Sequence, residues 1–519
     1  MHLVLTFLLA VALDPGLGDF HWKVTTKNAK AQAFFDQGMK YVYAFNHESA
    51  VRSFGEAARL DPNLAMAHWG MALALGPNIN LDVDPDREKE AYQAVQAALK
   101  LSPPASAKER DLIAALAKRY SIAPDADLRK LSVEYSGAMG SLAKKYPNDL
   151  DIATLYAESV MDLRPWKFWS HDGKPAEGTA EIVRTLESVL RRNPRHLGAN
   201  HYYVHAVEAS SHPERATASA ERLRTLAPAA GHLVHMPAHI FHRTGNYAGA
   251  AEANERGARA DRAYIASYGG HGIYPMMYYN HNLQFGLVAH AMIGRWAEAK
   301  RMADELSANA ATAAKEMPML ESATTTSLLL LARFGRWKEV LAAPKSEIGP
   351  LGAVLAHYAR GSAHAIFGNV AGAESEQRAL EAARKEVPDD TAMFQNSEQR
   401  IAEVASTLLG ARVAEARGDR TAAIAAYEKA VAQQDAMNYD EPPDWYYPIR
   451  ETLGAALLRA GRPADAERAF REDLRRNPRN PRSLYGLAAA LRAQKKDSAA
   501  VVAQFKKGWK GGGLRAEGY

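Results

Sequence analysis

Histidine is the residue type whose distribution in this chain most clearly suggests chemistry. Eight of the 18 histidines fall between His196 and His242. Four of them follow one another at intervals of three, four and three residues: His232, His235, His239 and His242. Residues three and four apart in an α-helix are neighbours on its surface, so this spacing predicts four imidazoles along one helix face.

A second group of the same kind lies one segment earlier in the chain. His201, His205 and Glu208 are spaced by four and three residues, so they also share a helix face. Packed helices lie about 8–10 Å apart, which lets imidazoles from two neighbouring helices meet. The two groups are therefore expected to converge, together with His281 at the start of a third helical segment.

Helix geometry limits how many of these residues one metal ion can use. From His232 to His242 a helix rises about 15 Å, so one ion cannot bind all four. The expected ligands of a single ion, two from each helix, are His201, His205, His235 and His239. The remaining groups could bind a second ion, orient the ligands or contact a substrate. They are Glu208, His232, His242 and His281. Pro237 is expected to kink the second helix and shift this register.

The chain has no cysteine, so a metal would have to be held by histidine, carboxylate, methionine, tyrosine or backbone oxygen. Such ligands suit a transition metal, and intrinsic affinity favours copper, with zinc and iron as alternatives. Tyr202 and Tyr278 are candidates for hydrogen bonding to a cofactor or for redox chemistry. Glu208 is a candidate ligand or general base. Haem held by an axial histidine is a weaker alternative, and its covalent attachment would require cysteine.

Other interpretations of the histidines stay open. An isolated histidine in a helical repeat is usually a packing or surface residue, which suits His68, His290, His357 and His364. The cluster itself could form a metalloenzyme with redox or hydrolytic chemistry, a metal carrier or store, or a groove that binds a peptide or protein. An enzyme would keep an open coordination position, a store would fill its sites, and a scaffold would purify without metal.

The elements that must position the histidines are helices arranged in repeats. Strong helix formers such as Ala, Leu, Arg and Glu dominate the composition. Pro194 and Pro228 are 34 residues apart and divide the histidine region into successive units at 197–230 and 231–264. The same pattern of small, aromatic and proline positions runs through 31–64, where it is carried by Gly38, Ala50, Phe54, Ala57 and Pro62.

This pattern resembles the tetratricopeptide repeat, a unit of about 34 residues that forms two antiparallel helices. The resemblance covers nearly the whole chain. It implies an all-α, right-handed helical solenoid whose concave groove binds partners, and it places the histidine positions on that groove. The segment GHLVHMPAHIFHRTGNY is similar to a His-rich bacterial subfamily of these proteins, to which no activity is assigned. Function therefore has to be argued from the site.

The repeats and their interruptions divide the chain into six parts. They are a signal peptide (1–20), N-terminal repeat helices (21–104), irregular hairpins (105–196) with an aromatic loop at 165–178, the His-rich units (197–310), a C-terminal array (311–508) and a flexible tail (509–519).

Charge and hydropathy narrow the classes of partner. The net charge of +5 is small for 519 residues, and basic residues alternate with acidic ones, which argues against a nucleic-acid-binding protein. The apolar run from Leu3 to Leu13 is too short to span a membrane and has the length of a signal-peptide core. We expect a periplasmic or secreted protein without a membrane span; without export it would be cytoplasmic.

Export predicts that the mature protein lacks the residues before about Phe20, because signal peptidase removes this segment. N-terminal sequencing of protein from the native host would show the new terminus. An intact Met1 on protein from the cytosolic fraction would contradict the prediction.

Overall fold

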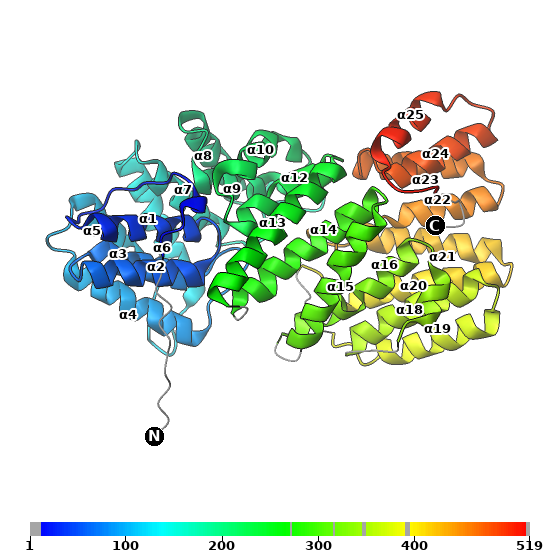
Figure 1. Ribbon diagram of the computed structural model, residues 1–519, viewed down its shortest axis with the longest axis horizontal. Helices are drawn as coiled ribbons and strands as arrows, with labels where there is room; N and C mark the ends of the chain where they lie inside the picture. Colours follow the sequence, from blue (N-terminus) through cyan, green and yellow to red (C-terminus); the bar gives the residue numbers. More distant parts are fainter. Residues whose placement is uncertain (1–11, 270–271, 315–316, 345–348, 390–394, 515–519) are drawn as a thin grey trace, which may run out of the picture. The chain divides into compact units, whose positions relative to one another are not determined.

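The computed structural model describes residues 12–269, 272–314, 317–344, 349–389 and 395–514. Within these ranges the regular structure is helical, with two isolated β-bridges and no strand (Figure 1). No helix in the described ranges is long and apolar enough to cross a membrane. The predicted all-α class is therefore confirmed.

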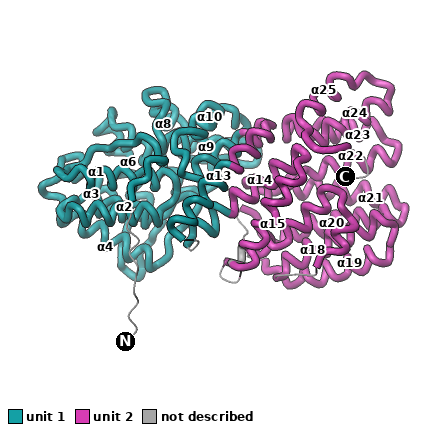
Figure 2. The backbone as a smooth tube through the Cα atoms, viewed as in Figure 1, with its two compact units in different colours: residues 1–240, 256–279 teal, residues 241–255, 280–519 magenta. Residues whose placement is uncertain are grey.

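The chain forms two compact units (Figure 2). Unit 1 comprises 1–240 and 256–279, and unit 2 comprises 241–255 and 280–519. The helices up to the histidine region are α1 (Ala29–Val42), α2 (His47–Leu60), α3 (Ala65–Leu75), α4 (Pro85–Leu101), α5 (Ala107–Leu116), α6 (Leu128–Lys145), α7 (Leu150–Met161), α8 (Thr179–Arg192), α9 (Leu197–Glu208), α10 (Thr217–Leu226), α11 (Gly231–His235), α12 (Pro237–Arg243) and α13 (Tyr247–Tyr268).

The helices that follow form a second series of antiparallel pairs. They are α14 (Asn280–Met292), α15 (Trp296–Ala313), α16 (Thr326–Arg333), α17 (Trp337–Ala342), α18 (Pro350–Ile366), α19 (Val370–Arg384), α20 (Glu398–Ala416), α21 (Arg420–Asp435), α22 (Ile449–Arg459), α23 (Pro463–Arg476), α24 (Pro481–Ala493) and α25 (Ala499–Gly508). There are three 3₁₀ helices, η1 (Pro15–Leu17), η2 (Pro213–Ala216) and η4 (Pro318–Thr325), and one π-helical turn, η3 (Pro275–Tyr279), in the described ranges.

One packing motif explains how successive hairpins stack. In unit 1 the fully buried ring of Phe54 on α2 fits against Gly38 on α1 and Gly70 on α3. A Cβ atom on either glycine would lie 2.5 Å from that ring, closer than side chains can approach. Because the small residues come from the helices before and after the aromatic one, each hairpin is locked to the next.

Unit 2 repeats this motif with different residues. Phe470 on α23 is fully buried and fits against Gly454 on α22 and Gly486 on α24. Added Cβ atoms there would lie 2.5 and 2.2 Å from its ring. Glycine occupies turns inside the hairpins: Gly418 and Gly461 have φ angles of 83° and 72°, the left-handed region that glycine adopts without strain. Both units are thus arrays of tetratricopeptide-type hairpins.

The described residues at both ends of the chain pack against the helical units. Of the predicted signal segment, residues 1–11 lie outside the described residues, and the rest packs in unit 1. Leu17 is buried, and the backbone oxygen of Gly16 accepts a hydrogen bond from Ala229 N at 2.9 Å. Of the predicted tail, 515–519 lie outside the description, while Lys510 N donates to Ile293 O at 2.8 Å. Removal of a signal peptide would therefore break contacts of the described fold, and export stays a prediction.

The Phe54 motif generates a stability prediction. The change Phe54→Ala removes a ring buried between three helices and leaves a cavity, so the free energy of unfolding should fall by about 3–5 kcal/mol. Chemical denaturation followed by circular dichroism measures this loss. The control Leu128→Ala, at a 41 % exposed position on α6, should change stability little. Equal effects of the two changes would contradict the proposed packing.

Candidate metal centre

The candidate centre lies in unit 1 and is built from two successive helical segments. Helix α9 supplies His201, His205 and Glu208, as the sequence predicts. The second segment is interrupted at Pro237: α11 ends at His235, and α12 begins at the proline. Proline lacks the amide hydrogen and obstructs the preceding turn, which accounts for the break. The six side chains gathered here are at most 2 % exposed: His201, His205, Glu208, His232, His235 and His239.

Several imidazole nitrogens in this group approach one another closely. Nε2 of His201 lies 3.1 Å from Nε2 of His232, and Nε2 of His235 lies 2.8 Å from Nε2 of His239. Metal–nitrogen bonds of about 2.0–2.1 Å place adjacent ligand nitrogens roughly 3 Å apart. One nitrogen from each of His201, His205 and His232 also lies within 4.8 Å of the other two. These separations are hydrogen-bond lengths, and they would also suit imidazoles that converge on an ion.

Hydrogen bonds fix which nitrogen of three rings carries the proton. Nδ1 of His201 donates to the backbone oxygen of Tyr43 at 2.8 Å. Nδ1 of His205 donates to Oε1 of Glu208 at 2.8 Å, and Nδ1 of His239 donates to Oε2 of the same carboxylate. Because a carbonyl or carboxylate oxygen only accepts, the proton of each neutral ring is on Nδ1. Nε2 of His201, His205 and His239 therefore presents a lone pair.

The charges at the centre favour this protonation pattern. Burial would raise the pKa of Glu208, but the neighbouring His239 and His205 outweigh it and lower that pKa to about 2. Burial lowers the pKa of His201 well below its usual value, and the adjacent His205 lowers it further. Burial also lowers the pKa of His205, partly opposed by Glu208. At neutral pH the centre thus holds a carboxylate at Glu208 and neutral imidazoles at His201 and His205, the protonation states that metal binding needs.

One of these lone pairs lacks a protein partner. Nε2 of His205 is fully buried and has no hydrogen-bond partner within the described part of the chain. An unsatisfied buried acceptor costs about 1–3 kcal/mol. In native proteins such a group usually has an explanation, such as a metal ion or a catalytic role. The His205 ring lies 4.9 Å from that of His201 and 5.4 Å from that of His239, measured between centroids.

Two aromatic side chains cover the centre from left-handed backbone conformations. Phe45 has a φ of 56°, and its ring contacts those of His201, His232 and His205 at 4.5, 5.6 and 6.0 Å. Trp166, in the predicted aromatic loop, has a φ of 61°, and its ring lies 5.6 Å from that of His205. Such backbone is strained for a bulky residue and persists where the surroundings impose it.

The sequence placed the histidines on an open groove, whereas the structure encloses them. The turn after α1 brings Phe45 over the rings, and η3 brings Tyr278 to 4.8 Å from the ring of His232. Tyr202 lies 5.4 Å from the His201 ring, so both predicted tyrosines border the centre. The spacing of the repeats predicts which helix face carries the histidines. It does not predict the long-range contacts that cover this face.

Two predicted ligands belong to unit 2. His242 and His281 both pack against Phe285, with ring centroids 5.4 and 5.9 Å apart. His242 also contacts Tyr247 at 5.1 Å. The structure thus brings His232 to His201 and His205 in unit 1, whereas the sequence assigned it to the remaining groups. The break at Pro237 accounts for this difference in register.

Sequence analysis missed a buried ionic cluster in unit 1. Arg119 donates to Asp162 at 2.7 Å, and both side chains are at most 3 % exposed. Glu158 lies beside them, and burial together with the charge of Asp162 raises the pKa of its carboxyl well above the usual value. The signal was present: Glu158 and Asp162 are four residues apart at the C-terminal end of α7, where Asp162 is the C-cap residue.

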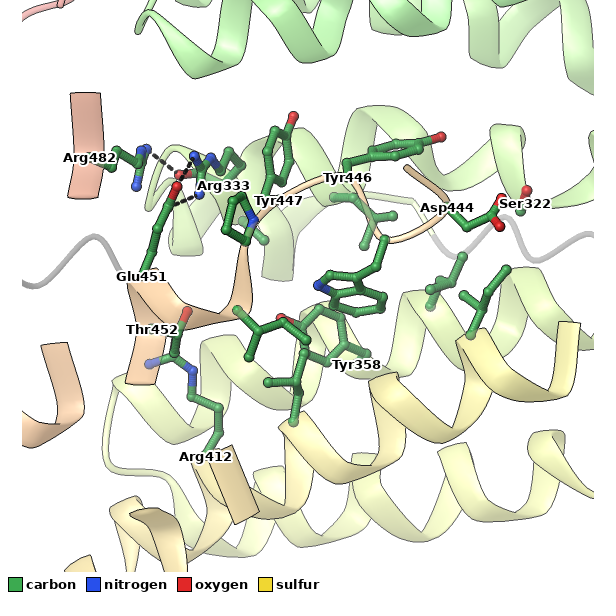
Figure 3. A pocket seen from close by; sticks show the side chains of 18 of the residues that line it. Ser322, Arg333, Tyr358, Arg412, Asp444, Tyr446, Tyr447, Glu451, Thr452 and Arg482 are labelled. Carbon is green, nitrogen blue, oxygen red and sulfur yellow. Dashed lines mark hydrogen bonds and ion pairs between the residues drawn. The ribbon is translucent and has the colours of Figure 1, made fainter. Parts of the chain in front are cut away.

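Unit 2 contains a cavity of about 110 Å³ beside the aromatic–proline segment 439–448 (Figure 3). Its wall includes an ion pair between Arg333 and Glu451 at 2.5 Å, and the Arg333 guanidinium lies 4.1 Å from the centre of the Tyr447 ring. Tyr358 and Arg412 lie on the side of the view opposite Arg333. No histidine lines this cavity, so it is unlike the centre in unit 1.

Comparison with known proteins gives only distant similarities. No family model and no curated protein matches the chain. Solved structures that are similar include human IFIT1 bound to m7Gppp-AAAA (13 % identity over 93 % of this chain and 90 % of that chain, TM-score 0.33). They also include yeast Tom70 (10 %, 93 % of each chain, 0.31) and the P58(IPK) TPR domain (11 %, 90 % and 99 %, 0.24). The class of this protein, an all-α array of tetratricopeptide-type hairpins, rests on its own packing.

The buried neutral histidines predict a loss of stability in mild acid. Burial, with a smaller effect of Arg87, lowers the pKa of His47 to about 3. Between that value and the unfolded value near 6.5, the unfolded chain binds the proton and the folded protein does not. Stability is therefore full above about pH 6.5 and falls as the pH decreases.

Urea unfolding of the metal-free protein at pH 7 and pH 5 tests this sign. Between these values His47 alone should account for a decrease of about 1–2 kcal/mol in the free energy of unfolding. The change His47→Phe should reduce the decrease by that amount, whereas His212→Phe, at a 69 % exposed side chain, should not. Greater stability at pH 5 than at pH 7 would show that the sign is wrong.

Proposed function

We propose that unit 1 binds a transition-metal ion through Nε2 of His201, His205 and His232. The observation that carries this proposal is the buried lone pair of His205, which has no hydrogen-bond partner among the described residues and lies beside two further imidazoles. A metal ion would satisfy that nitrogen, and it would replace the hydrogen bond between Nε2 of His201 and Nε2 of His232, with His232 moving its proton to Nδ1. His235 and His239 form an adjacent pair beside these three ligands, with their Nε2 atoms 2.8 Å apart.

Glu208 acts in this proposal by orienting ligands. Its two oxygens accept from His205 and His239, so one carboxylate holds the imidazoles of two helices in the orientation that presents Nε2. Histidine ligands commonly donate their other ring nitrogen to a carboxylate or a backbone carbonyl, which also raises their basicity. Tyr43 supplies the carbonyl for His201. The general-base role that the sequence suggested for Glu208 is less favoured, because its two oxygens already have these partners.

The donor set favours copper, with zinc as the alternative. Neutral imidazoles bind both ions, and the intrinsic affinity order puts copper above its neighbours. Three protein ligands leave a coordination position for water or substrate, the arrangement of catalytic rather than structural sites. We therefore place redox or hydrolytic chemistry ahead of simple metal storage. The competing function, a scaffold that binds a peptide or protein, is favoured by no specific contact at this centre.

Two variants test the metal site, one that removes a proposed ligand and one that alters the residue that orients the ligands. Isothermal titration with copper and zinc should show binding to the wild-type chain that is nearly lost in His205→Ala. The change Glu208→Gln, which keeps size but removes the carboxylate, should weaken affinity by about 10–100-fold. Metal should also raise the unfolding temperature of the wild-type protein, because the unfolded chain lacks a preformed site.

The matched control is His212→Ala, an exposed histidine of the same unit, which should bind as the wild type does. Equal affinity in His205→Ala and His212→Ala would place the metal elsewhere. Absence of copper and zinc binding to the untagged wild-type protein would reject the metal proposal and favour the scaffold.

A further inference from the structure

A cavity of about 320 Å³ adjoins the histidine centre within unit 1. Helix α2, the end of α3, the loop before α4 and η3 enclose it, with mostly apolar side chains: Phe45, Val51, Leu75, Leu81, Ile273 and Tyr278. Its volume falls within the range of about 300–1,000 Å³ that is usual for small-molecule sites. The cavity is therefore large enough for one small organic molecule.

The cavity and the histidine centre share a wall one aromatic ring thick. Phe45 lines the cavity, and its other side contacts the rings of His201, His205 and His232. Tyr278 does the same, with its ring centroid 4.8 Å from that of His232. A molecule in the cavity would thus lie next to the imidazoles without any helix between them.

The polar groups of the lining are few and carry no net charge. Arg87 donates to the backbone oxygen of Gly76 at 3.3 Å, and Glu48 accepts from the amide of Ile273 at 3.0 Å. Their charges balance. His47 is neutral at pH 7, and its Nδ1 is buried with no hydrogen-bond partner in the described ranges. Asn78 stands beside it, 3.5 Å from its Nε2. These groups suit a ligand with a hydroxyl rather than a charged one.

We infer that this cavity binds a small neutral aromatic molecule with one hydroxyl group, a phenol in chemical class. The rings of Phe45, Tyr274 and Tyr278 offer edge and face contacts to an aromatic ring, and His47 and Asn78 offer the polar contact. A carboxylate or ammonium would lose its hydration in this apolar lining without gaining an unbalanced opposite charge. The role of the phenol as a substrate or effector of the metal centre rests on the proposed function. Its binding in the cavity does not.

Fluorine NMR of the full-length, metal-free protein with 4-fluorophenol tests the binding. Saturable binding is expected, and 4-fluorobenzoate should bind at least roughly tenfold more weakly because its charge would be desolvated. The changes Val51→Trp and Leu81→Phe add side-chain volume at two separate walls and should each weaken 4-fluorophenol by about tenfold or more. The control Leu128→Trp, on the exposed face of α6, should bind as the wild type does.

Circular dichroism identifies any variant that has failed to fold. If one of the two cavity-filling variants, Val51→Trp and Leu81→Phe, does not fold, the other decides the result. Wild-type affinity in a folded filling variant, equal affinity for 4-fluorobenzoate, or no saturable binding to the wild-type protein would overturn the inference.

A second measurement separates this inference from the proposed function. With copper(II) bound at the histidines, the paramagnetic ion should strongly broaden the fluorine signal of bound 4-fluorophenol, and His205→Ala should abolish the broadening. Binding of the phenol without any metal uptake would support the cavity and reject the metal proposal. Binding of both without broadening would overturn their adjacency.

Discussion

The arrangement of the centre depends on one buried carboxylate. Glu208 accepts hydrogen bonds from His205 of its own helix and from His239 of the following repeat. Taking a carboxylate out of water costs several kcal/mol, and this cost is offset only where donors surround the charge. The low pKa of Glu208 indicates that they do. The same bonds fix the tautomers of both rings, so one interaction sets the charge, the orientation and the available lone pairs.

A second constraint is steric and comes from the repeat itself. The hairpins stack because small residues meet a large ring, as Gly38 and Gly70 meet Phe54. At the turn after α1, by contrast, Phe45 adopts a left-handed conformation like that of glycine in other hairpin turns, with a φ of 56°. A bulky residue in this conformation is strained, and its ring lies over three histidines. The first repeat thus departs from its pattern where it touches the centre, as expected when local strain serves a site.

Local periodicity explains what could be predicted from the sequence. Helices, hairpin turns and the shared face of His201, His205 and Glu208 follow from spacings of three and four residues, and the break at Pro237 follows from proline chemistry. The enclosure of the centre could not be predicted, because Phe45 reaches it from more than 150 positions away in sequence. The division into two units, which assigns His281 to unit 2, likewise depends on tertiary packing.

The position of the centre between repeats also links binding to the mechanics of the array. In a solenoid each repeat contacts only its neighbours, so stability is a sum of repeat and interface contributions. His201 and His205 come from one repeat and His232 from the next, and the nitrogens meet only when that interface is formed. An ion held by all three would strengthen this interface and the repeats cooperative with it. In the proposed function the centre would therefore be both a metal site and a connection between neighbouring repeats, and substitutions that loosen the interface should weaken both roles together.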